Sequence, residues 1–400
     1  MVKSCEVCDS NNIKEALDLG NHALCDDLIK IDDYRENKKY PIRVFFCNNC
    51  FTAHQFCQPS KKELFPEEYH YRARFTLDVL NGMKELVDSV ESFIGDLSGL
   101  KVIDIGCNDG SLLNLFSKKG CKTFGIEPTA AVNDIDHRDH NIMKDFFTMA
   151  SSNKLLSNFG KFDLITFTNV FAHINDLDSL LKSVENLMHE NSILVIENHY
   201  LGAILEKNQF DTFYHEHPRT YSLKSFVSIA EKLKRHLSLI SFPNRYGGNI
   251  RVFISKIEPS DKIFNLIKET TKKESKFKKN FKDLSFFINS WKLEKRNEIL
   301  NLVRENKGPI VAKAFPGRAA ILINILDLDS NHIKCIFEKP GSKKLGHFVP
   351  GSDIPIVSDE LLFNDINKHK YILNLAWHIP IEIKNYLLSK GFKGLLVDII

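Results

Sequence analysis

The stretch Val102-Ile-Asp-Ile-Gly-Cys-Asn-Asp-Gly-Ser-Leu-Leu113 decides the fold of this 400-residue chain. An apolar run ends in Asp104, Gly106 and Gly110 flank two polar residues, and an apolar helix begins directly afterwards. Such a strand, glycine turn and helix opens a doubly wound α/β domain, and the tight turn lets the backbone approach a ligand closely. The sequence therefore predicts a nucleotide-like cofactor at this turn.

Acidic residues at the strand ends indicate which cofactor binds. The turn lacks G-x-G-x-x-G spacing, and Asp104 would repel a pyrophosphate, whereas it suits the cationic amino and sulfonium groups of S-adenosylmethionine. Glu127 ends the next strand, where doubly wound folds hold ribose hydroxyls, and Asp145-Phe146 follow the third strand, where they would bracket the adenine. The residues assigned to the cofactor are Asp104, Gly106, Asn108, Asp109, Glu127, Pro128, Asp145, Phe146 and Asn169.

Strands and helices alternate along most of the chain, which predicts parallel sheets covered on both faces. Before the glycine turn, residues 66–93 have a helical stripe of Leu77, Leu80, Met83, Leu86, Val87 and Val90. Residues 237–242 and 250–255 predict a closing hairpin. Residues 258–306 predict a charged helical connector rather than a nucleic-acid-binding arm, because acidic residues interleave the lysines. A second α/β unit follows, with strands expected at 310–314, 333–338, 354–357, 371–375 and 395–399.

Four of the nine cysteines form two Cys-x-x-Cys pairs, Cys5 with Cys8 and Cys47 with Cys50. This is the spacing of a zinc ribbon, in which two knuckles close a tetrahedral thiolate site. Four thiolates leave no open position on the metal, so the zinc would be structural. A redox dithiol is the alternative, but it needs one pair only and leaves the second unexplained.

Composition narrows the class of protein. Lys and Arg number 54 against 51 Asp and Glu, a balance that gives no sign of a nucleic-acid or anionic-membrane partner. The N-terminus lacks a signal-peptide core, and no apolar stretch approaches the roughly 20 residues of a membrane span. We therefore expect a cytoplasmic, monomeric protein that binds neither nucleic acid nor membrane.

Titratable residues gather in Phe213-Tyr-His-Glu-His217, with Asn169 and His173 after the fourth strand. The carboxyl ends of strands are where an α/β sheet places its chemistry, so these residues predict an acid/base site. Metal binding through His215 and His217 is the rival hypothesis, although their spacing matches no common catalytic zinc site.

Taken together, these motifs resemble the sugar C-methyltransferases of deoxysugar biosynthesis along the whole chain. The shared landmarks are Cys5, Cys8, Cys47, Cys50, residues 104–110, 125–128, 169–173, 210–217, Tyr221-Ser222, Gly247-Gly248 and 349–355. The resemblance implies a small N-terminal zinc-binding module, a doubly wound class I methyltransferase core and a C-terminal Rossmann-like α/β domain. The boundaries that we expect are 1–78 for the module, 79–257 for the core, 258–306 for the connector and 307–400 for the substrate-binding domain.

The family resemblance also implies a reaction. Its members methylate C3 of a nucleotide-linked 4-keto-6-deoxy sugar by removing the acidic proton beside the ketone and passing the enolate to the methyl donor. Carried onto this chain, His217 becomes the general base, and Tyr214 and Glu216 orient it or polarise the sugar. Tyr71 enters the pocket, with Tyr69 as the alternative, and His173 lies near the transferred methyl group.

Two stretches depart from the family pattern and leave the substrate open. Arg72-Ala-Arg74 replaces small hydroxyl residues, and residues 314–320 lack the usual lysine. The arginines could bind a diphosphate in bidentate fashion or lie on an exposed helix face. O-methylation of a sugar and a zinc-ribbon RNA methyltransferase are the alternatives to C-methylation.

Overall fold

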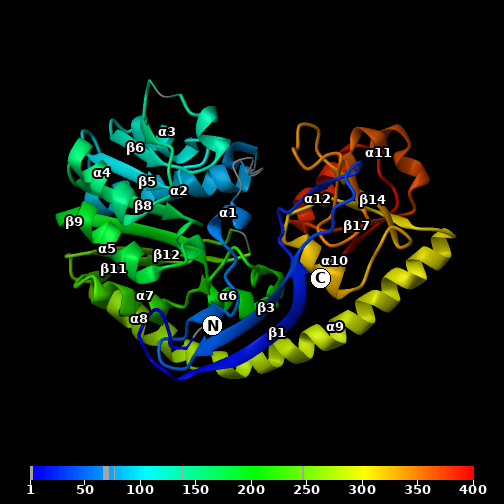
Figure 1. Ribbon diagram of the computed structural model, residues 1–400, viewed down its shortest axis with the longest axis horizontal. Helices are drawn as coiled ribbons and strands as arrows, with labels where there is room; N and C mark the ends of the chain where they lie inside the picture. The colour runs from blue at the N-terminus through cyan, green and yellow to red at the C-terminus, as the bar shows by residue number, and fades with distance from the viewer. Residues whose placement is uncertain (1–2, 66–71, 76, 137, 246) are drawn as a thin grey trace. The chain divides into compact units, whose positions relative to one another are not determined.

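The computed structural model describes residues 3–65, 72–75, 77–136, 138–245 and 247–400 (Figure 1). The chain divides into two compact units, each of which is described by itself. The first comprises Met1–Ala16, Val44–Gln209 and Glu216–Asn280, and the second Leu17–Arg43, Phe210–His215 and Phe281–Ile400. The predicted boundaries of the four domains stay predictions.

A seven-stranded sheet with the order β11-β12-β9-β8-β5-β6-β7 forms the centre of the first unit. Its strands are β5 (Lys101–Ile105), β6 (Lys122–Ile126), β7 (Asn141–Met143), β8 (Phe162–Thr168), β9 (Met188–His199), β11 (His236–Ser241) and β12 (Asn249–Ser255). The ladders from β7 to β9 are parallel, whereas β12 is antiparallel to both neighbours. This is the topology of a class I methyltransferase, and it contains the predicted hairpin of β11 and β12.

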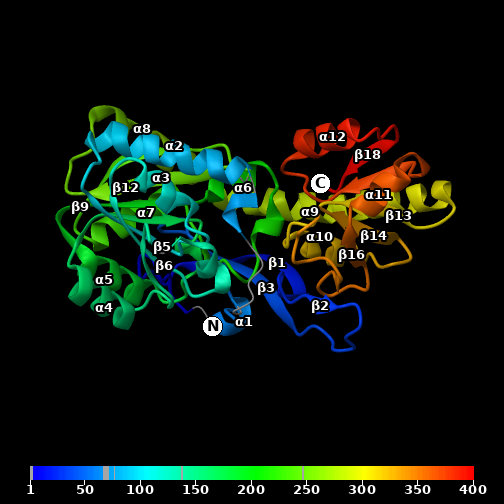
Figure 2. The ribbon, with the colours of Figure 1, turned by 90° about the horizontal axis from the view of Figure 1, so that it is seen from above.

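Helices cover both faces of this sheet (Figure 2). On one face, Val102 and Leu164 are covered by α2 (Leu77–Ile94) and α3 (Ser111–Ser117). On the other face, Ile103 and Ile165 are covered by α4 (Met149–Phe159), α5 (Leu177–Leu187) and α7 (Leu223–Lys232). Neighbouring strand residues thus face opposite layers, as the two-residue period of a strand requires. The remaining helices of this part are α1 (Lys61–Leu64), α6 (Leu201–Glu206), α8 (Asp261–Glu274) and the short 3-10 helices Ala73–Phe75, Ala130–Asp134 and Phe171–His173.

Helix α2 confirms most of the stripe predicted before the glycine turn. Met83, Leu86, Val87 and Val90 are buried in it. Leu77, however, is 67% exposed, so its assignment to the stripe is wrong. It is the first residue of the helix.

The cysteine pairs belong to a four-stranded sheet with the order β1-β3-β4-β10, built from β1 (Ile13–Ala23), β3 (Lys39–Cys47), β4 (Ala53–Gln55) and β10 (Arg219–Thr220). Strand β10 comes directly after His217 and pairs antiparallel with β4, with Arg219 opposite His54. Cys5, Cys47 and Cys50 are buried in the same apolar cluster as the strands of the central sheet. The cysteine-bearing segment is therefore packed into the core of this unit.

In the second unit the sheet has the order β18-β17-β13-β14-β16-β15-β2, in which the first five strands are parallel. The strands are β2 (Ile29–Lys30), β13 (Ile310–Lys313), β14 (Ile333–Glu338), β15 (His347–Phe348), β16 (Pro355–Ser358), β17 (Tyr371–Asn374) and β18 (Leu395–Asp398). The helices are α10 (Ala319–Ile325), α11 (Glu360–Asn364), α12 (Pro380–Ser389) and the 3-10 helices Phe210–Thr212 and Ile366–Lys368. With β13 in the middle and α10 directly after it, the predicted Rossmann-like arrangement is confirmed.

The predicted connector consists of two helices, α8 and α9 (Phe277–Asn306), with a break after Glu274. No helix in the described part of the chain is long and apolar enough to cross a membrane.

A buried ionic network joins β9 and β12 of the first unit to α2. The Glu197 carboxylate lies 2.7 Å from Nε of Arg251 and 3.2 Å from Nε of Arg245, and it accepts a hydrogen bond from Asn249 at 3.0 Å. Arg251 also donates to the carbonyl of Gly82 at 3.2 Å. A Cβ at Gly82 would lie 1.8 Å from Nη1 of Arg245, so glycine makes room for the guanidinium.

We predict that Glu197→Gln lowers the free energy of unfolding by about 3–5 kcal/mol, because it leaves two buried guanidinium groups without their counter-charge. Urea unfolding measures the loss. Glu91→Gln is the control, because its carboxylate pairs with Lys119 where both side chains are more than a third exposed. An equal loss in both variants would contradict a special role for the buried network.

Candidate active site and metal centre

The glycine turn has the backbone that the sequence predicts. Gly106 and Gly110 have φ of 73° and 74°, in the left-handed region that favours glycine. A Cβ at Gly106 would lie 2.6 Å from Cγ2 of Val170, so the turn touches the segment that follows β8. The cofactor turn and the end of β8 are therefore direct neighbours.

Asp104 is buried below this turn and accepts a hydrogen bond from the Thr166 hydroxyl at 2.7 Å. Burial raises its pKa to about 7, the Thr166 bond opposes the shift, and the nearby Glu127 carboxylate adds to it. A buried carboxyl with this pKa gains most from a cationic ligand, because a positive charge favours its ionised form. The site electrostatics agree with the cofactor chosen from the sequence.

Glu127 is buried and bonded within the chain. Its Oε1 accepts from the Thr129 amide at 2.9 Å and the Thr129 hydroxyl at 2.6 Å, and its Oε2 accepts from the Asn108 amide at 3.1 Å. These bonds fix the carboxylate at the end of β6 beside the glycine turn. Pro128 lies between Glu127 and Thr129 in the sequence. Its role in holding ribose hydroxyls stays a prediction.

The polar pair inside the turn binds a neighbouring segment. Oδ1 of Asn108 accepts from the Ala73 amide at 3.0 Å, and Oδ2 of Asp109 accepts from the Arg74 amide at 2.9 Å. The segment that carries the two unusual arginines is thereby held against the cofactor turn.

Both of those arginines pair with Asp134. Nε of Arg72 lies 2.6 Å from the Asp134 carboxylate and Nη2 of Arg74 lies 3.3 Å from it. Arg72 is buried, so its interpretation as part of an exposed helix face is wrong. Tyr71 and Tyr69 lie outside the described residues.

The predicted adenine-bracketing pair follows β7, as expected. Oδ1 of Asp145 accepts from the Phe146 amide at 2.8 Å, and Phe146 is half-buried. Nothing in these contacts excludes or requires a ligand.

Three histidines gather at the carboxyl edge of the central sheet. The ring of His217 lies 4.9 Å from that of His173 and 5.3 Å from that of His199, measured between centroids. Burial lowers the pKa of His173 to about 4, and its Nδ1 contacts the Glu216 carbonyl oxygen at 2.7 Å. A neutral His173 places no positive charge beside His217, which keeps His217 available to accept a proton.

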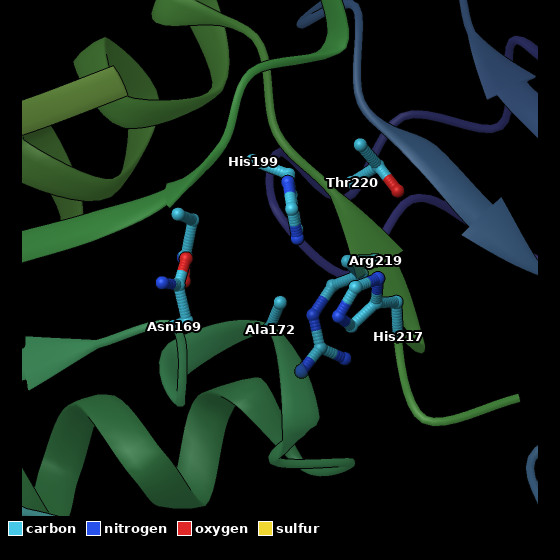
Figure 3. Close-up of a pocket in the computed structure, with 7 residues that line it drawn as sticks. Asn169, Ala172, His199, His217, Arg219 and Thr220 are labelled. Carbon is cyan, nitrogen blue, oxygen red and sulfur yellow. The ribbon is translucent and has the colours of Figure 1, made fainter. Parts of the chain in front are cut away.

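A pocket opens between these side chains (Figure 3). It is lined by Asn169, Ala172, Asn198, His199, His217, Arg219 and Thr220, and the space free of protein atoms, including the solvent at its opening, is about 220 Å³. His199 projects into it between Asn169 and the His217–Arg219 segment (Figure 3). Asn169 has a φ of 54°, and its Oδ1 accepts from Asn249 at 3.3 Å, so the ionic network reaches the pocket through it.

The sequence analysis found two of these residues, Asn169 and His217, and missed the end of β9. Asn198 and His199 come directly after the apolar run Ile193-Leu-Val-Ile196 and Glu197, and the signal that identified Asn169 after β8 applies to them equally. Arg219 lies in a strand of two residues, too short for any periodicity to show.

Tyr214 and His215 fall in the part of the motif that belongs to the second unit. Nε2 of His215 contacts the Tyr40 carbonyl oxygen at 3.1 Å, and burial lowers its pKa to about 4. Among the described residues, only the four cysteines bring three or more metal-ligating side chains close enough to share an ion, which disfavours metal binding through His215 and His217.

Those four cysteines have the geometry of a zinc site. All four Sγ atoms lie within 4.8 Å of one another, and Sγ of Cys5 is 3.3 Å from that of Cys50 while Sγ of Cys8 is 3.7 Å from that of Cys47. A tetrahedral Zn–S bond of about 2.3 Å sets the sulfurs about 3.8 Å apart. The closed donor set fits a structural zinc ion.

Polar groups around the cysteines suit thiolates. Thr52 Oγ1 lies 3.0 Å from Sγ of Cys50, Nδ2 of Asn49 donates to Sγ of Cys8 at 3.3 Å, and Nε2 of His54 lies 3.3 Å from Sγ of Cys5. Such outer partners orient metal ligands.

Comparison with known proteins supports a zinc-binding segment followed by a methyltransferase domain. Residues 5–65 match a family profile described as a zinc binding domain, residues 75–233 one described as a methyltransferase domain, and residues 244–392 one described as a C-methyltransferase C-terminal domain. The chain is 24% identical over 390 residues to the C-methyltransferase NovU of Streptomyces niveus, which covers 96% of this chain and 91% of that protein.

Two further similarities cover less of the chain. A ubiquinone biosynthesis O-methyltransferase of Pelagibacter ubique is 29% identical over 102 residues, which is 25% of this chain and 42% of that protein. The magnesium protoporphyrin IX methyltransferase of Synechocystis, solved with bound SAH, is 17% identical with a TM-score of 0.34, and covers 44% of this chain and 84% of that chain.

The sheet topology, the glycine turn and these matches define a methyltransferase that uses S-adenosylmethionine and contains a structural zinc site. More narrowly, the chain is a C-methyltransferase, with matches to a zinc binding, a methyltransferase and a C-methyltransferase C-terminal domain in that order.

We predict that Cys8→Ser releases the zinc and lowers Tm by roughly 5–10 °C, because lost metal binding is lost folding free energy and 1 kcal/mol shifts Tm by about 2–4 °C in a domain of this size. Metal analysis and thermal unfolding measure the two effects. Cys57→Ser in the same segment should retain the metal, and loss of zinc from this control would show that the two Cys-x-x-Cys pairs are not the site.

Proposed function

We propose that this enzyme methylates C3 of a nucleotide-linked 4-keto-6-deoxy sugar through an enolate, with His217 as the general base. The observation that carries the proposal is the position of His217. It is 5% exposed and lines the pocket whose Asn169 and Ala172 belong to the segment touched by the cofactor turn.

The chemistry needs a base beside an acidic carbon and a methyl donor on the other side of that carbon. His217 removes the C3 proton, the electron pair passes to the ketone oxygen, and the enolate carbon then takes the methyl group. S-adenosylmethionine supplies an electrophilic methyl and leaves as S-adenosylhomocysteine. A base of near-neutral pKa is the suitable group for this task at physiological pH.

The other roles follow from family resemblance. Glu216 and Tyr214 orient the base or polarise the sugar, and His173 lies near the transferred methyl. The domain at 307–400 binds the nucleotide part of the substrate. The substrate is a small molecule, and the enzyme works as a cytoplasmic monomer without nucleic acid or membrane.

We predict that His217→Asn abolishes both C3 exchange and methylation, because asparagine keeps a hydrogen-bonding shape but cannot accept the proton. The protein is incubated in deuterium oxide with an NDP-4-keto-6-deoxy sugar, and deuterium at C3 is read by mass spectrometry. The expected loss is at least about a hundredfold. Exchange at the wild-type rate would remove His217 from the mechanism.

We also predict that cofactor binding releases a proton from Asp104. Its pKa is raised to about 7, so near pH 7 the carboxyl is partly protonated, and a bound cation shifts it toward the ionised form. Affinity for S-adenosylmethionine should therefore weaken as the pH falls below 7. Calorimetry in buffers of different ionisation enthalpy measures the proton count. Identical counts for the wild type and Asp104→Asn would contradict this role.

A further inference from the structure

Asn198 is a buried amide with no protein partner. It lies in β9, is 1% exposed and lines the pocket beside His217. Neither its Nδ2 nor its Oδ1 makes a hydrogen bond to any described residue. Burying an amide without partners is costly, so proteins retain one where something other than the protein satisfies it.

Asn169, Arg219, His199 and His217, which also line the pocket, interact with other residues of the protein. Asn169 accepts from Asn249, and the Arg219 guanidinium donates to the Tyr221 hydroxyl at 2.9 Å and to the Asn175 carbonyl at 2.7 Å. His217 and His199 lie against each other's rings. Gln55 is also buried without a side-chain partner, but it does not line the pocket. Asn198 both lacks a side-chain partner among the described residues and lines the pocket.

The chemistry of an amide indicates what would satisfy it. A carboxamide presents donors and an acceptor side by side, so it pairs with a carbonyl next to a hydroxyl. A 4-keto sugar has this arrangement at C4 and C3, the carbon that loses its proton. The pocket is small and lined by only seven residues, so it takes in only the reacting end of a ligand.

Resting on the proposed function, we propose that Asn198 binds the acceptor sugar directly. Its Nδ2 donates to the C4 ketone oxygen, and its Oδ1 accepts from the C3 hydroxyl. When His217 removes the C3 proton, negative charge develops on the ketone oxygen, and the same donor stabilises it. Asn198 is then a catalytic residue as well as a determinant of specificity for α-hydroxy ketones.

Asn198→Leu tests this assignment, because leucine has a similar volume and no hydrogen-bonding group. We expect an unchanged or raised Tm, since an unsatisfied polar group is removed, and unchanged affinity for S-adenosylmethionine. With an NDP-4-keto-6-deoxy sugar, kcat/KM and C3 exchange in deuterium oxide should both fall about a hundredfold, the usual effect of losing one donor to a developing oxyanion.

Asn186→Leu is the matched control. Nδ2 of Asn186 donates to Ser152 at 3.0 Å and to Asn153 at 2.9 Å, so the same substitution should lower Tm and leave kcat/KM unchanged.

Two results with Asn198→Leu would overturn the assignment. A lowered Tm would show that the amide is structurally satisfied, and wild-type kinetics would show that it contacts no reacting group. The proposed function fails separately, when the wild-type protein itself neither exchanges nor methylates the keto sugar.

Discussion

The fully buried guanidinium of Arg219 makes the contacts that hold together the edge of the sheet where the pocket lies. It bonds to Glu6 in the first cysteine knuckle, to the carbonyl oxygens of Ile174 and Asn175 after β8, and to Tyr221. Its strand pairs with β4. Because His217 comes two residues earlier, the same contacts fix this proposed base relative to the sheet.

These contacts connect the zinc-binding segment to the methyltransferase domain. Ser222 donates to the Cys50 carbonyl at 2.9 Å, and the Thr52 and Ser225 hydroxyls lie 2.7 Å apart, so the second knuckle is bound to the start of α7. A zinc ion bound by the four cysteines would hold the two knuckles together. The metal therefore organises structure, whereas the chemistry is proposed for the histidines and amides of the pocket.

Much of the fold follows from local patterns in the sequence. The glycine turn, the alternation of strands and helices and the cysteine spacing each express a short-range rule, and the structure has all three. The pocket was harder to predict, because its walls come from segments distant in sequence. Asn198 has only its place at a strand end to mark it in the sequence, and the lack of a partner among the described residues is what distinguishes it in the folded protein. The sequence leaves Arg72 open to two interpretations, diphosphate binding or an exposed helix face, and the structure excludes the second because the side chain is buried against Asp134.

The central claim is that the methyl group is attached to carbon beside a ketone. The direct measurement uses S-adenosylmethionine labelled with ¹³C in the methyl group, a panel of NDP-4-keto-6-deoxy sugars, and mass spectrometry with NMR of the products. The account predicts a labelled methyl bonded to C3, with the C3 proton gone. A label on a sugar oxygen, or equal turnover of the corresponding sugar without the keto group, would contradict it.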